Sequence, residues 1–71
     1  MEQIIISAVE ALGKQVVLDD FPRWISHAEV VLAALKANSD LVKFGVEFHI
    51  LRVEAEIKFL NAVLDYVKAN P

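Results

Sequence analysis

Three ionisable side chains, His49, Arg52 and Glu56, follow one another at helical spacing in this 71-residue chain. On one helix they would share a face, and Arg52 and Glu56 would be one turn apart. Such a pair contributes only about 0.3–0.5 kcal/mol in water, but under another molecule it would fix partner choice or register. Two interpretations stay open: an ion pair that serves the fold, and a surface that contacts a partner.

A second polar group, Arg23 and His27, flanks Trp24 directly after Phe21 and Pro22. Arginine and tryptophan are enriched among residues that dominate binding energy at interfaces. Trp24 also belongs to an apolar stripe, which favours a place in the core, whereas Arg23 and His27 lie off that stripe and are expected at the surface. These three side chains complete the candidate partner-binding set with His49, Arg52 and Glu56.

Residue types that carry catalysis or bind metals are sparse. There is no cysteine, and the two histidines have neither the His-x-x-x-His nor the Glu-x-x-His spacing of helical metal sites. No Gly-x-Ser-x-Gly turn is present, and the two glycines are isolated, so no glycine-rich loop could cradle a phosphate. The sequence predicts a protein that is not an enzyme and has no cofactor or metal.

Charge and hydropathy narrow the class of partner. The formal net charge of −3 disfavours nucleic acid, because lysine and arginine supply most of the affinity for phosphates. The longest apolar run, Val30 to Leu35, is far shorter than the roughly 20 residues that cross a bilayer. Glu2 stands where a secretory signal carries positive charge. We therefore expect no contact with membranes and a cytoplasmic location.

Two boundary signals divide the chain into three helices. Pro22 follows Asp19 and Asp20, a pattern typical of a helix start, and Asn38 precedes Ser39 and Asp40, which is typical of a helix end followed by a new cap. The sequence thus predicts one all-α domain over residues 1–71, with two shorter helices at about 2–17 and 22–37 and a long helix at about 40–68. The apolar stripes of the shorter helices are Ile5, Val9, Leu12 and Val16, and then Trp24, Ala28, Val31 and Leu35.

The long helix is apolar on two sides. One row is rich in phenylalanine and is expected to receive the two shorter helices: Leu41, Phe44, Phe48, Leu51, Ala55, Phe59, Ala62 and Tyr66. The other row is a regular heptad seam and is the expected dimer interface: Val46, Ile50, Val53, Ile57, Leu60, Leu64 and Val67. Small domains without disulfides need oligomerisation or a metal to be stable, so a homodimeric helical bundle is favoured over a three-helix monomer.

The function that fits is that of a small regulator that binds a larger protein, such as a transcriptional regulator, and inhibits or remodels it. One alternative is a helical dimer that binds nucleic acid, for which all seven cationic side chains would have to gather on one face. Another is a structural subunit of a larger assembly.

The acidity, the lack of cysteine and the plan of a short helix, Phe21-Pro22-Arg23-Trp24 and a long helical pair resemble small phage-encoded proteins that take over host regulators. Quorum-sensing anti-activators, compact helical dimers that bind a LuxR-type regulator, are the family this chain looks like. The resemblance is one of size and plan over the whole chain and transfers no functional residue. It implies a host protein as partner.

Overall fold

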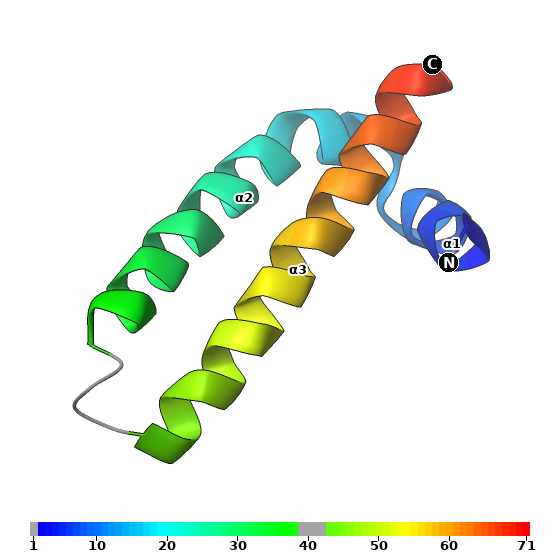
Figure 1. Cartoon of the computed structure of the whole chain (residues 1–71). Helices are drawn as coiled ribbons and strands as arrows, with labels where there is room; N and C mark the ends of the chain where they lie inside the picture. Colours follow the sequence, from blue (N-terminus) through cyan, green and yellow to red (C-terminus); the bar gives the residue numbers. More distant parts are fainter. Residues whose placement is uncertain (1, 39–42) are drawn as a thin grey trace.

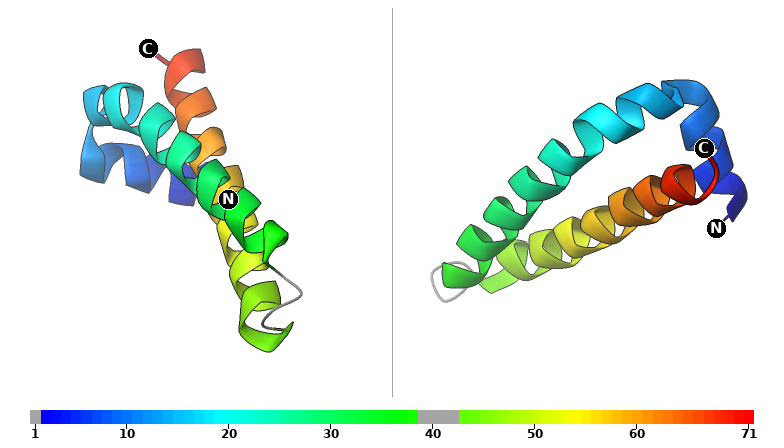
Figure 2. Two further views of the ribbon diagram at one scale, coloured as in Figure 1. Left: turned by 90° about the vertical axis from the view of Figure 1, so that its left-hand side faces the viewer. Right: turned by 90° about the horizontal axis from the view of Figure 1, so that it is seen from above.

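The computed structural model describes residues 2–38 and 43–71, and within them it contains three helices and no strand (Figure 1). These are α1 (Glu2–Leu12), α2 (Lys14–Ala37) and α3 (Lys43–Ala69). The helices α2 and α3 form an antiparallel hairpin, and α1 lies at the end of the hairpin where the C-terminus is (Figures 1 and 2). The all-α prediction is confirmed. The chain has one short and two long helices, however, rather than two shorter helices and one long one.

The boundary between the first two helices lies at Gly13, not between Val17 and Pro22 as the sequence predicted. Gly13 has a φ of 90°, in the region that side chains with a Cβ rarely adopt, and its N–H still donates to the Val9 carbonyl oxygen at 2.8 Å. A glycine that looked like a helix interior residue therefore ends α1 and turns the chain into α2.

Pro22 lies inside α2, so the prediction that a helix starts there is wrong. A proline in a helix costs about 3 kcal/mol because it removes one backbone hydrogen bond and crowds the preceding turn. Val17, Phe21 and Ile25 are all buried on one face of α2 on both sides of the proline. Each such side chain contributes about 1.5–3 kcal/mol on burial, which offsets the cost of the proline. The aspartates before it bind other side chains instead, Asp19 to Gln15 and Asp20 to Arg23.

The C-terminal ends of α2 and α3 are closed by asparagines in the same way. The Asn38 side-chain amide donates to the Ala34 carbonyl oxygen at 2.7 Å, and the Asn70 amide donates to the Tyr66 carbonyl oxygen at 3.0 Å. Asn38 has a φ of −110°, so it caps α2 through its side chain and not through a left-handed backbone. The predicted ends at 37 and 68 agree with the structure to within one residue, while the predicted start at Ser39-Asp40 lies outside the described residues.

The core is concentrated where all three helices meet, at the end of the hairpin that carries α1. Its buried members are Ile5 and Val9 of α1, Val17, Phe21 and Ile25 of α2, and Leu60, Val63, Leu64 and Val67 of α3. Ala8, Phe59, Ala62 and Tyr66 are partly buried against it. Towards the other end of the hairpin only two helices pack together, and Val31, Leu35, Val46 and Ile50 are only half-buried.

Several sequence expectations about these helices need correction. Leu12 and Trp24, which were expected in the core, are 42% and 43% exposed, because the turn at Gly13 and the continuous α2 rotate the buried face to Val17, Phe21 and Ile25.

Over the residues described, none of the three helices combines the length and apolar character that crossing a bilayer requires.

The two glycines give a matched test of the boundary at Gly13. In both cases an added Cβ would meet no atom within 4 Å, so backbone conformation alone decides the effect. Gly13→Ala should lower the free energy of unfolding by about 1–2 kcal/mol, because alanine is strained at positive φ. Gly45→Ala, inside α3, should raise it by about 0.5–1 kcal/mol. Urea denaturation of both variants measures the signs, and a stabilising Gly13→Ala would contradict the boundary.

Candidate protein-interaction site

A groove between α2 and α3 brings together four of the six predicted partner-binding residues. It has a volume of about 280 Å³. Its lining consists of Trp24, His27, Ala28 and Val31 from α2 and Arg52, Val53 and Glu56 from α3. We call this surface the Trp24 groove. Residues that are far apart in the sequence meet here because α2 and α3 run antiparallel (Figure 1).

The lining of the Trp24 groove combines an apolar interior with charged edges. Ala28 and Val53 are buried, Val31 is half-buried, and His27, Arg52 and Glu56 are exposed. An apolar centre with a polar, charged margin is the usual anatomy of a protein interface. The groove can therefore accept an apolar side chain from another protein and offer both signs of charge around it.

Trp24 connects the groove to the core. Its ring centroid lies 5.0 Å from that of Phe21, with the ring planes tilted by 35°, and Phe21 is almost fully buried. The tilted aromatic contact holds the indole against the core while a large part of it stays in contact with solvent. An aromatic side chain fixed in this way loses little further conformational freedom on binding, which is typical of a binding anchor.

The remaining predicted partner-binding residues lie next to the groove and have partners of their own. Arg23 is paired with Asp20 on the same side of α2 and is largely exposed. The Arg52 Nη2 atom lies 3.3 Å from His49 Nδ1, so the guanidinium can donate to an unprotonated imidazole. In the part of the chain that the structure describes, Arg52 and Glu56 form no ion pair with each other, although their spacing would permit one. Both charges remain available at the groove.

The residues predicted for the dimer interface occupy a different place from the one expected. Val53, Leu60, Leu64 and Val67 are buried within the single chain, and Val46, Ile50 and Ile57 are half-buried. The regular row of α3 thus packs against α2 and α1. This differs from the expected placement of the row, because a regular heptad row suits the long neighbouring helix of the same chain as well as it suits a second copy.

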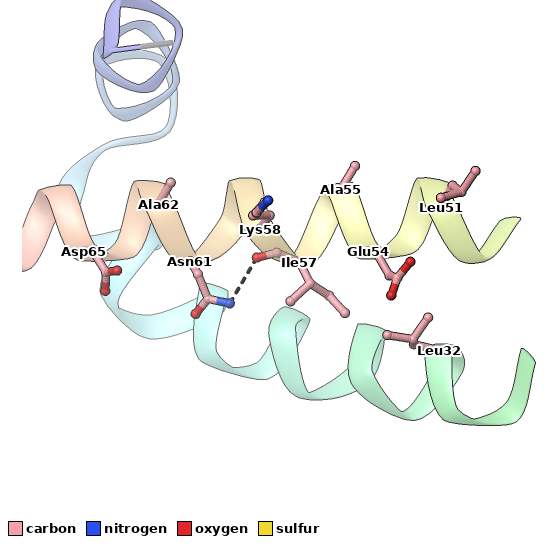
Figure 3. Close-up of a pocket in the computed structure, with 9 residues that line it drawn as sticks. All are labelled: Leu32, Leu51, Glu54, Ala55, Ile57, Lys58, Asn61, Ala62 and Asp65. Atoms are coloured by element: carbon pink, nitrogen blue, oxygen red, sulfur yellow. Dashed lines mark hydrogen bonds between the residues drawn. The ribbon is translucent and has the colours of Figure 1, made fainter. Parts of the chain in front are cut away.

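A wide hollow of about 860 Å³ lies on the other side of α3 (Figure 3). Its lining is almost entirely from α3 and comprises Leu32, Leu51, Glu54, Ala55, Ile57, Lys58, Asn61, Ala62 and Asp65. The Asn61 side chain donates to the Ile57 carbonyl oxygen at 3.0 Å. This hollow shares no lining residue with the Trp24 groove. Sequence reasoning missed it because the phenylalanine-rich row was expected to be covered along its whole length.

The described residues include no group of three histidine, aspartate or glutamate side chains that could hold a metal ion. No family model, curated protein or solved structure matches this chain. What the site can do must therefore be argued from its own residues.

The packing of the regular row of α3 within the chain can be tested with two valines. Val67 is 2% exposed in the predicted dimer seam, and Val30 is 68% exposed on α2. Val67→Ala should lower the free energy of unfolding by about 2 kcal/mol, because it removes buried methyl groups and leaves a cavity. Val30→Ala should be neutral or slightly stabilising. Thermal and urea unfolding provide the measurement, and equal effects of the two changes would contradict the placement of Val67.

Proposed function

We propose that this chain is a small, non-enzymatic, cytoplasmic regulatory protein that binds a segment of a larger protein in the Trp24 groove and thereby inhibits or remodels it. We further propose that it does so as a homodimer. A transcriptional regulator is the class of partner we favour.

The observation that carries the proposal is the convergence of Trp24, His27, Arg52 and Glu56 on one groove. Their positions in the sequence did not require this, since they come from two different helices. The groove offers a partly exposed tryptophan, apolar residues beside it, and an acid and a base that are not paired with each other. These are the features that concentrate binding energy at interfaces.

The chemistry of the groove favours a protein over a nucleic acid. The positive charge of Arg52 is balanced by Glu56 at the same site, and the chain as a whole is acidic. A phosphate backbone would meet a carboxylate there and would gain little from counterion release. A protein segment with an apolar side chain and charges of both signs fits better.

The proposal predicts that charge reversal at the groove weakens binding without unfolding the chain. With tagged protein used to capture its partner from cells that encode it, Arg52→Glu and Glu56→Lys should each reduce recovery of the main captured protein at least about fivefold. Glu29→Lys, an exposed reversal on α2 outside the groove, is the matched control and should leave recovery unchanged. Circular dichroism should show equal helix content in all variants.

Trp24→Ala tests the anchor in the same assay. Loss of an interface tryptophan typically costs 2 kcal/mol or more, so the Kd for the captured partner should rise about 30-fold or more. Capture unaffected by Trp24→Ala and by both charge reversals would remove the groove from the function. If gel shifts showed a complex with DNA or RNA whose affinity falls steeply as the salt concentration rises, they would favour the nucleic-acid alternative instead.

A further inference from the structure

One apolar face of α3 has no partner in the chain. Phe48 and Leu51 are 72% and 66% exposed, Ala55 is exposed, and Ala62 is half-buried. Leu51, Ala55 and Ala62 lie on the same side of α3, away from α2, and α1 lies only beyond the Ala62 end (Figure 3). We call Phe48, Leu51 and Ala55 the Leu51 face, because Ala62 already packs against the core.

The surface of the chain is larger than a monomer of this mass should have. The accessible area is 5123 Å², whereas a compact monomer of 7.9 kDa is expected to expose about 4,400 Å². The radius of gyration is 14.1 Å, against about 11 Å expected for 71 residues. The excess area is about 700 Å², close to the roughly 800 Å² that each partner buries in a standard interface. The excess therefore matches what one stable interface would cover.

We propose that a second copy of this chain covers the Leu51 face, with the two α3 helices packed antiparallel about a two-fold axis near residues 52–54. This inference rests on the homodimer of the proposed function and assigns its surface. Leu51 and Ala55 lie two residues on either side of residue 53, so they are equally far from that axis. Each Leu51 of one copy thus meets the small Ala55 of the other, as the symmetry of a two-fold interface requires.

Charge complementarity selects the antiparallel arrangement. Glu47 and Lys58 border the Leu51 face, are exposed, and are centred on the same stretch of α3. Among the described residues, neither side chain forms an ion pair or a hydrogen bond. In the antiparallel pair each Glu47 lies opposite Lys58 of the other copy, whereas in a parallel pair this edge of α3 faces the opposite edge of the other helix, so Glu47 and Lys58 do not meet. A second copy therefore buries the apolar side chains of the Leu51 face and also pairs the charges at its edge.

This dimer leaves both Trp24 grooves accessible. The lining of the groove includes Trp24, Arg52 and Val53, none of which belongs to the Leu51 face. The dimer would thus present two equivalent grooves to its partner. Dimerisation and partner binding can be disrupted separately.

Sedimentation equilibrium tests the surface directly. Wild-type protein should be dimeric at tens of micromolar, and Leu51→Asp should weaken dimerisation more than 100-fold without loss of helix content. Val30→Asp, which changes an equally exposed aliphatic residue on α2, should leave the dimer intact. A monomeric wild type would overturn both the homodimer and this surface, while a dimer that tolerates Leu51→Asp would overturn the surface alone. Neither result would affect capture of a partner by the groove.

A charge exchange tests the antiparallel register. Glu47→Lys and Lys58→Glu should each raise the dimer Kd about tenfold, because each creates two like-charge contacts across the two-fold axis. The double variant Glu47→Lys/Lys58→Glu should restore the wild-type Kd to within about twofold. A double variant as weak as the single ones would overturn the register.

Discussion

The placement of α1 across one end of the hairpin is the constraint on which the rest of the structure depends. The positive φ at Gly13 turns the chain from α1 into α2, and α1 crosses α3 near its C-terminal end and does not run along its 27 residues (Figures 1 and 3). One part of α3 therefore has two neighbours in the chain and the other part has one. The fully packed core, the half-buried residues towards the end of the hairpin away from α1 and the exposed Phe48 and Leu51 all follow from this difference.

The sequence predicted the fold class and the apolar sides of α3 better than it predicted where the first two helices meet and how the helices pack. The all-α class, the end of α2 at Ala37 and the two apolar sides of α3 follow from periodicity and from Asn38, and the structure has them. The first helix boundary was misplaced because proline and aspartate are strong local signals for a helix start. Burial of Val17 and Phe21 on either side of that signal depends on tertiary packing, which local patterns do not contain. The positive φ of Gly13 could not be inferred from the spacing of the apolar residues, which continues through that position.

The sequence identified most polar residues of the candidate site, but it did not show that they meet in one groove. Residue type marked Arg23 and Trp24, since arginine and tryptophan are enriched at interfaces, and helical spacing marked His49, Arg52 and Glu56. Their meeting in one groove depends on the register of α2 against α3, and that register is set by buried side chains elsewhere, such as Ile25 and Leu60. The same dependence explains why the regular row of α3 was assigned to a second copy, although it packs within the chain. Both rows satisfy the periodicity, so the sequence pattern does not distinguish their neighbours.

The central claim is that a second copy lies on the part of α3 that α1 cannot reach, and contacts between copies test it most directly. In an equal mixture of isotope-labelled and unlabelled protein, isotope-filtered NMR detects side-chain contacts between copies only. The account predicts such contacts from Leu51 to Ala55. Contacts between copies that involve Val30 or Trp24 instead, with none from Phe48 or Leu51, would contradict it.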